Sequence, residues 1–336
     1  MAPKRDMKGT FNNARPVALS IYQRTADRGL LFYSVIDFLV YFTLLCTLAR
    51  RFRIQVLGVC PMFDHVHVLT KNESRKEVSP FFRELNKGYT ESFNSSTGRK
   101  GSLFEKGFGA AEKHGEKSIK TSYSYVYNNP VEKKLAAVSQ NYRWTFLAYA
   151  ASDHPFSEKI VLRKASMDLR RALKEVQAFR KKDAPLSEPC LRRLFAKLDY
   201  REKNQLVDYI ISRYNCIDYS EMFKLYGSYE KACLAFASNQ GSEYDMKEDF
   251  DPYSHKAYVQ MCKYLVSKKG FESAKDVLRL PDDARVVLFQ ELLMSTSATP
   301  RQVEKLLHLF RVRGGKSSTR PEEQRRGDDD LGRENP

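Results

Sequence analysis

The first 150 residues alternate between two hydrophobic periods, and this alternation limits the possible folds more than any other feature of the sequence. Apolar residues at every second position predict strands, and apolar residues three or four apart predict helices. The predicted order is strand, helix, strand, strand, helix, extended segment, helix and edge strand, over residues 16–24, 37–51, 54–60, 65–70, 79–93, 103–111, 117–129 and 143–149. We expect Asp37 to cap the first helix and Pro130 to end the last one. This order predicts an α+β fold in which an antiparallel sheet carries helices on one face.

From about residue 160 onward the pattern is helical almost throughout, which predicts a separate all-α domain. The expected helices span residues 163–182, 188–213, 218–239, 253–269, 283–294 and 299–311. We therefore divide the chain into a first domain at 1–150 and a helical domain at 160–311. Residues 313–336 have balanced charges and almost no large apolar side chains, which predicts a disordered tail.

Two segments of the second half have patterns that occur in DNA-binding proteins. Residues 284–311 resemble a helix-turn-helix, in which Thr299 caps the second helix and Pro300 begins it. The helix predicted at 163–182 is strongly basic. Ordinary packed helix pairs and plain amphipathic helices have the same patterns, so both readings stay open.

The composition favours an acidic partner for this chain. Its 57 basic and 41 acidic residues give a formal net charge of +16, and residues 1–150 hold 23 of the basic and 12 of the acidic ones. A soluble protein this basic most often binds nucleic acid. The six cysteines have no CxxC spacing, which predicts a reduced protein of the cytoplasm. The most apolar stretch, residues 30–48, is interrupted by Asp37 and predicts a core helix rather than a membrane span.

His65 and His67 are separated by one residue within a predicted strand. Residues two apart in a strand point to the same face, so the two imidazoles should project together. Two neighbouring imidazoles form half of a site for a divalent metal ion. A chance pair is the alternative. The other four histidines are isolated, and we expect them to be surface or hydrogen-bonded structural residues.

Tyr125 and Asn129 form the second pattern, near the end of a predicted helix. Residues four apart lie on one helix face. The neighbouring tyrosines, Tyr123 and Tyr127, have no carboxamide at that spacing. Beside a metal ion, a phenol and an amide oxygen would supply a nucleophile and a third ligand. Taken alone, the pattern is more typical of a half-buried core tyrosine and an ordinary helix end.

Four segments together resemble the HUH single-strand transposases with one catalytic tyrosine, specifically the REP-associated tyrosine transposase-like branch with its IS200-like domain. Residues 21–25 resemble the family's opening strand, 60–69 its Met-Pro-Asn-His-Val-His-Leu-Leu signature, 101–108 its Gly-Thr-Leu-Trp-Gln-Gly-Arg-Phe segment and 125–131 its Tyr-Ile-x-x-Asn-Pro-Val helix end. The segments occur in the family's order and cover about residues 10–150. Two departures are visible. Asp64 stands where asparagine is usual, and residues 107–109 lack a basic residue common there.

The resemblance implies an RRM/ferredoxin-like catalytic domain and a specific chemistry. His65, His67 and the side-chain oxygen of Asn129 would hold Mg²⁺ or Mn²⁺. Asp64, which departs from the family's asparagine, adds negative charge beside the histidines and would either strengthen metal binding or support the ligands from behind. Tyr125 would attack a DNA phosphate in line, leaving a 5′-phosphotyrosine link and a free 3′-hydroxyl. Because the tyrosyl ester stores the bond energy, strand transfer would need no ATP.

The expected partner is single-stranded or hairpin DNA, with no membrane involved, and the resemblance leaves open whether the protein is a homodimer. Basic residues that follow the histidine strand are candidates for phosphate contacts: Lys71, Arg75, Lys76, Arg83, Lys87, Arg99 and Lys100. Two alternatives remain. A catalytically silent module could bind DNA hairpins, although its catalytic residues are all present. A metal-dependent nucleotide phosphoesterase would use paired HxT/S motifs, whereas this chain has a single HxH.

Overall fold

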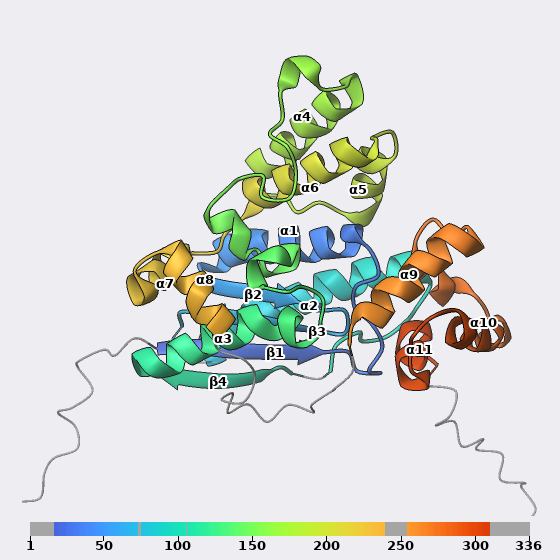
Figure 1. Cartoon of the computed structure of the whole chain (residues 1–336), viewed down its shortest axis with the longest axis horizontal. Helices are drawn as coiled ribbons and strands as arrows, with labels where there is room; N and C mark the ends of the chain where they lie inside the picture. The colour runs from blue at the N-terminus through green and yellow to red at the C-terminus, as the bar shows by residue number, and fades with distance from the viewer. Residues whose placement is uncertain (1–16, 73–74, 106, 239–253, 310–336) are drawn as a thin grey trace, which may run out of the picture.

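The computed structural model describes residues 17–72, 75–105, 107–238 and 254–309 (Figure 1). Four strands form one antiparallel sheet in the order β2-β3-β1-β4. The strands are β1 (Val17–Arg24), β2 (Val56–Pro61), β3 (His65–Thr70) and β4 (Gly109–His114). His67 in the middle of β3 pairs with Tyr22 of β1 on one side and with Cys60 of β2 on the other.

Different helices cover the two faces of this sheet. They are α1 (Val35–Phe52), α2 (Arg75–Thr97) and α3 (Gly115–Glu132). Val66 and Val68 pack in one hydrophobic cluster with buried residues of α1 and α2. Leu69 points to the other face and packs with Val126 of α3. Since side chains alternate along a strand, the α3 face also carries His65 and His67.

The fold class predicted from the sequence is confirmed. Strands β1 to β4 with α1 and α2 between them have the βαββαβ order of an RRM/ferredoxin-like domain, and the C-terminal region is mostly helical. Helix α3 adds a cover to the second face, and this is the helix that faces the histidines.

The second half packs around the sheet domain. Its helices are α4 (Met167–Lys181), α5 (Glu188–Phe195), α6 (Tyr200–Tyr214), α7 (Tyr219–Tyr226), α8 (Tyr229–Ser238), α9 (Lys256–Lys269), α10 (Asp282–Ser295) and α11 (Pro300–Leu307). In Figure 1, α4 to α6 lie above α1, α7 and α8 lie at one end of the sheet, and α9 to α11 lie at the other. None of the helices in the described ranges is long and apolar enough to cross a bilayer.

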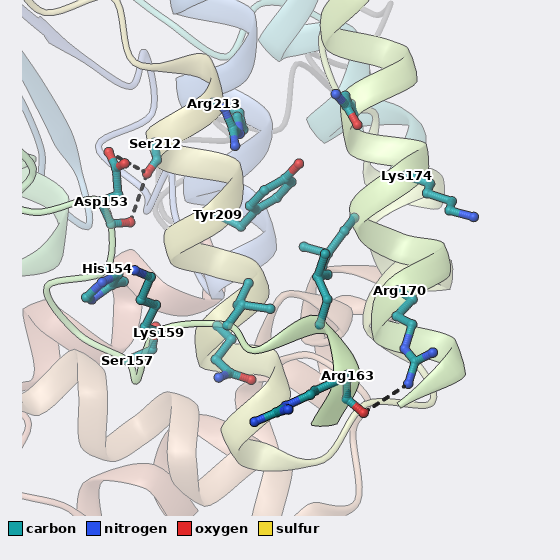
Figure 2. Close-up of a pocket in the computed structure, with 15 residues that line it drawn as sticks. Asp153, His154, Ser157, Lys159, Arg163, Arg170, Lys174, Tyr209, Ser212 and Arg213 are labelled. Atoms are coloured by element: carbon teal, nitrogen blue, oxygen red, sulfur yellow. Dashed lines mark hydrogen bonds between the residues drawn. The ribbon is translucent and has the colours of Figure 1, made fainter. Parts of the chain in front are cut away.

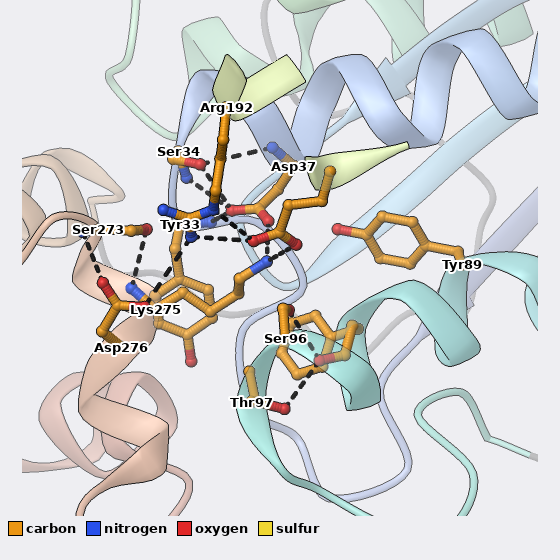
Figure 3. A network of polar contacts seen from close by, with 12 residues as sticks. Tyr33, Ser34, Asp37, Tyr89, Ser96, Thr97, Arg192, Ser273, Lys275 and Asp276 are labelled. Carbon is orange, nitrogen blue, oxygen red and sulfur yellow. Dashed lines mark hydrogen bonds and ion pairs between the residues drawn. The ribbon is translucent and has the colours of Figure 1, made fainter. Parts of the chain in front are cut away.

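Lys275 joins the second half to α1 through a buried ion cluster (Figure 3). It lies in a short 3₁₀ helix, and its Nζ is 2.6 Å from Oδ1 of Asp37 and 2.5 Å from Oε2 of Glu188. The three side chains are 2%, 2% and 5% exposed. Oδ2 of Asp37 also accepts hydrogen bonds from the backbone N–H groups of Tyr33 and Ser34. The cluster therefore fixes the start of α1 and the start of α5 against the 3₁₀ helix.

The hydrophobic core also runs through both halves. The cluster beneath α1 and α2 includes Tyr258 of α9 and Leu306 of α11. The division into domains at 1–150 and 160–311 stays a prediction. The expected tail at 313–336, and the end of the predicted helix-turn-helix, lie outside the described residues.

The prediction that Asp37 caps α1 is wrong, and so is the expected stop at Pro130. Ser34 is the cap, and Asp37 completes a capping box by accepting from the backbone N–H of Ser34. Pro130 lies inside α3, which ends at Glu132. Its carbonyl oxygen still accepts a 2.8 Å hydrogen bond from the N–H of Leu135, so the last turn closes beyond it.

The prediction of a strand at residues 143–149 is also wrong. The segment forms two short 3₁₀ helices, Arg143–Thr145 and Leu147–Ala150. Phe146 between them has a φ of 59°, which turns the chain. The aromatic side chains of residues 143–149 are therefore buried by these turns rather than by one face of a sheet.

Two predicted long helices are each divided into two. Within 188–213, Asp199 starts α6 because its side chain accepts from the backbone N–H of Glu202. Within 218–239, Gly227 ends α7 in a left-handed conformation with a φ of 88°.

Candidate active site

Strand β3 places His65 and His67 together beneath α3. Their ring centroids are 4.8 Å apart and nearly perpendicular, and the residues are 8% and 0% exposed. The ring of Tyr22 on β1 lies 5.5 Å from the His65 ring and 5.3 Å from the His67 ring. The pair is therefore fixed by the sheet register on one side and covered by an aromatic ring.

Helix α3 brings Tyr125 and Asn129 to the same two histidines. Nδ2 of Asn129 lies 2.9 Å from Nε2 of His67. The ring of Tyr125 lies 5.0 Å from the ring of His67 at an angle of 85°. Both α3 residues are largely buried, at 9% exposure for Tyr125 and 4% for Asn129. Four residues that the sequence analysis selected thus lie at one place.

The neighbouring tyrosines of α3 point elsewhere. Tyr123 and Tyr127 pack in the second hydrophobic cluster, with rings 6.1 Å apart and no exposed surface. The hydroxyl of Tyr127 donates to the carbonyl oxygen of Leu57 at 3.5 Å. Burial raises the pKa of both phenols above the usual value, so neither readily becomes a phenolate. Among these three tyrosines, the geometry favours Tyr125.

Asp64 holds His65 from behind. Its Oδ1 accepts from Nδ1 of His65 at 2.8 Å, which leaves Nε2 of that ring with a lone pair. Burial alone would raise the pKa of Asp64, but His255, His65 and Lys305 together hold it well below the usual range. The carboxylate is therefore ionised and able to fix the tautomer and orientation of the histidine.

Two further residues at this place come from the C-terminal helices. Nζ of Lys305 on α11 lies 2.8 Å from Oδ2 of Asp64, although the two are 241 residues apart in the chain. Nε2 of His255, just before α9, lies 3.7 Å from Oδ1 of Asp64. His255 is 1% exposed, and within the described part of the chain neither of its ring nitrogens makes a hydrogen bond.

The sequence analysis missed both of these residues. His255 is not the surface or hydrogen-bonded residue that its isolation in the sequence predicts. No local pattern marks Lys305 either, because its partner belongs to a loop of the sheet domain.

The donor set fits a hard divalent ion. Burial, and then the neighbouring His65, lower the pKa of His67 well below its usual value, so its ring is neutral. In the structure the lone pair on Nε2 accepts from Nδ2 of Asn129, a hydrogen bond that a bound ion would replace. Oδ1 of Asn129 is buried and has no hydrogen-bond partner among the described residues. Two imidazoles and one amide oxygen leave room for water and phosphate oxygens. No cluster of three or more His, Cys, Asp or Glu residues suited to a metal occurs among the described residues, so such a site depends on the asparagine.

The candidate DNA-binding residues are not gathered at the histidines. Arg75, Lys76, Arg83 and Lys87 lie on α2, which covers the opposite face of the sheet. The guanidinium group of Arg75 lies over the ring of Phe108, 4.7 Å from its centroid.

The remaining three candidates differ in whether their charged groups are free to contact a phosphate. Lys71 pairs with Glu221 at 2.9 Å, and Lys100 is exposed. Arg99 donates to Asp27 at 3.2 Å and to the backbone of Ser102 at 2.8 Å, and its side chain is only 10% exposed. Arg99 therefore stabilises its own loop.

The structure is an RRM/ferredoxin-like sheet whose strand β3 carries two histidines beneath the tyrosine and asparagine of α3. Comparison with known families finds a match over the same region. Residues 28–129 match the family described as "Transposase IS200 like". This segment, which runs from before α1 to Asn129, is thus similar to the IS200-like transposase family.

One solved structure also resembles the chain at a distance. It is described as the "REP associates tyrosine transposase bound to a REP hairpin", with 14% identity, a TM-score of 0.33, and coverage of 48% of this chain and 94% of that one. This likeness is too distant to assign residues. No curated protein matches the chain.

Proposed function

We propose that this protein is a metal-dependent endonuclease and transposase of single-stranded DNA, with hairpin DNA as its substrate and Tyr125 as its nucleophile. The observation that carries the proposal is the approach of α3 to β3. The Tyr125 ring lies 5.0 Å from His67, whose Nε2 is 2.9 Å from Asn129. The family match over residues 28–129 supports the same chemistry.

His65, His67 and Asn129 would hold the ion, either Mg²⁺ or Mn²⁺. When bound, the ion would polarise the scissile phosphate and stabilise the leaving 3′-oxygen. The hydroxyl oxygen of Tyr125 attacks the phosphorus while the bond from phosphorus to the 3′-oxygen breaks. The phenol loses its proton, and the 3′-oxygen leaves as a hydroxyl. The product is a 5′-phosphotyrosine ester, which a second 3′-hydroxyl can attack to rejoin DNA.

Asp64 is a positioning residue in this proposal. Its Oδ1 accepts a hydrogen bond from Nδ1 of His65, which would leave Nε2 to hold an ion. Its negative charge also adds to the attraction of a cation. We expect the protein to act on DNA in the cytoplasm. A homodimer is a further proposal, which the structure of a single chain does not test.

Covalent adduct formation tests the proposal directly. The full chain is incubated with labelled single-stranded hairpins taken from DNA around its own gene, with Mg²⁺ or Mn²⁺, and resolved on a denaturing gel. We expect a protein–DNA adduct with the wild type and with Tyr127→Phe, a matched control on the same helix. Tyr125→Phe and His65→Ala should give none.

Other outcomes would contradict the proposal in different ways. Tight hairpin binding without any adduct would favour the catalytically silent binding module. An adduct that persists in Tyr125→Phe would show that another residue is the nucleophile.

A further inference from the structure

A second candidate site lies far from the histidines, in a pocket between α4, α6 and the segment 153–163 (Figure 2). Its volume is about 680 Å³. In Figure 1, α4 and α6 lie beyond α1, on the face of the sheet opposite α3. We call it the α4–α6 pocket, and its lining shares no residue with the candidate active site.

The lining is strongly basic. Its cationic side chains are Lys159, Arg163, Arg170, Lys174 and Arg213. Asp153 is the only acidic residue of the lining. Within the described ranges, no ion pair joins Lys159, Arg163 or Lys174 to a carboxylate. Several positive charges therefore surround a cavity with little compensation, which favours an anionic occupant.

The positive charges continue along one face of α4. Arg170, Lys174, Gln177 and Lys181 follow one another at intervals of four, three and four residues, which places them on a single stripe. Gln177 and Lys181 line an adjoining smaller cavity, together with Arg213. At 1.5 Å per residue the stripe is roughly 16 Å long. That length exceeds the axial spacing of about 3.4 Å between successive phosphates of one strand in a stacked duplex, so the stripe can meet more than one phosphate.

The pocket also offers surfaces for bases. Tyr209 projects from α6 into it, and the guanidinium group of Arg213 lies 5.1 Å from the centre of the tyrosine ring (Figure 2). Leu162 also lines the pocket and is 61% exposed, so it offers an apolar surface. A basic track beside an aromatic platform is the combination that binds single-stranded nucleic acid.

We propose that the α4–α6 pocket binds single-stranded DNA, with phosphates along the α4 stripe and a base against Tyr209 and Leu162. The choice of DNA rests on the proposed function, since this strand would belong to the molecule that the transposase site processes. An acidic peptide would use the charges but gain little from the aromatic platform.

Fluorescence anisotropy tests the proposal with the full-length chain and a labelled oligothymidylate of about 12 nucleotides. Lys174→Glu combined with Arg163→Glu should weaken binding at least about tenfold and lower the slope of log K against log salt by about 1.4. Tyr209→Leu should weaken it about 5- to 100-fold through lost stacking. Lys203→Glu, an exposed change on α6 outside the pocket, makes the same charge change as each pocket substitution and should bind like the wild type. Thermal unfolding of each variant verifies folding.

The outcomes separate this proposal from the proposed function. Wild-type affinity in both pocket variants would overturn the pocket, even if the hairpin adduct forms. Lost affinity in both variants, with no adduct from the wild type, would support the pocket and refute the transposase activity. If polyglutamate competes as well as the oligonucleotide and Tyr209→Leu changes nothing, the site accepts acidic chains in general and the proposal is wrong.

Discussion

Replacing Lys275 by methionine should destabilise the protein more than any exposed substitution. Lys275 is 2% exposed and neutralises Asp37 and Glu188, which are themselves 2% and 5% exposed. Methionine keeps most of the apolar stem but leaves two carboxylates buried without their cation. Removing one partner from a buried ion pair costs about 3–5 kcal/mol. This is a large fraction of the roughly 5–15 kcal/mol by which proteins are stable.

The loss is measurable by thermal and urea unfolding. At about 2 °C per kcal/mol for a long chain, the midpoint should fall by about 6–10 °C. Adding Glu188→Gln should recover part of the loss, because one of the two unpaired charges is then removed. Lys269→Ala, which breaks only an exposed pair with Glu291, serves as the control and should leave the midpoint unchanged. A midpoint in Lys275→Met within 2 °C of the wild type, by the same conversion, would refute this account of the cluster.

Four other outcomes are expected. Lys305→Met should lower adduct formation and metal affinity about 10- to 100-fold in calorimetric titration, since it loosens Asp64 behind His65. Gly29→Ala should destabilise the fold by about 1–3 kcal/mol in urea, because the added Cβ would clash with the buried ring of His308. A fragment ending at residue 150 should not unfold cooperatively, since it loses half of a shared core. Burial would raise the pKa of Glu188, but Lys275 and Arg192 lower it, so its stabilisation is present above about pH 4.3 and lost as the pH falls further. The urea midpoint should therefore drop on acidification, and drop less in Lys275→Met.

Local patterns were enough to predict strands β1 to β3 and the core of the candidate site. Strand β3 begins and ends at the residues that the alternation predicts, and that period of two puts both histidines on one face. The spacing of four residues between Tyr125 and Asn129 likewise selects one of the three tyrosines of α3, and in the structure its ring lies against that of His67. These features depend only on neighbours in the sequence.

The features that sequence reasoning missed depend on distant segments. The charge of α2 is visible in the sequence, but the face of the sheet that α2 covers is not. The sequence therefore does not reveal that these candidate phosphate-binding residues lie across the sheet from the histidines. Residues 143–149 alternate like a strand, yet Phe146 turns the chain and the segment forms two 3₁₀ helices. Lys305 and His255 meet Asp64 only because α11 and α9 pack beside the sheet.

The contact between Asp64 and Lys305 gives the C-terminal helices a part in the chemistry of the site. Without Lys305, the Asp64 carboxylate would lose a buried partner and the orientation of His65 would be less fixed. Lys305 is in turn held because its backbone carbonyl accepts from the N–H of Leu30, in the loop between β1 and α1. The helical second half is therefore not a passive addition to the sheet domain. The packing of α11 sets the position of Lys305, which holds the Asp64 carboxylate that orients His65. Changes that loosen α11 should therefore reduce activity before they unfold the sheet.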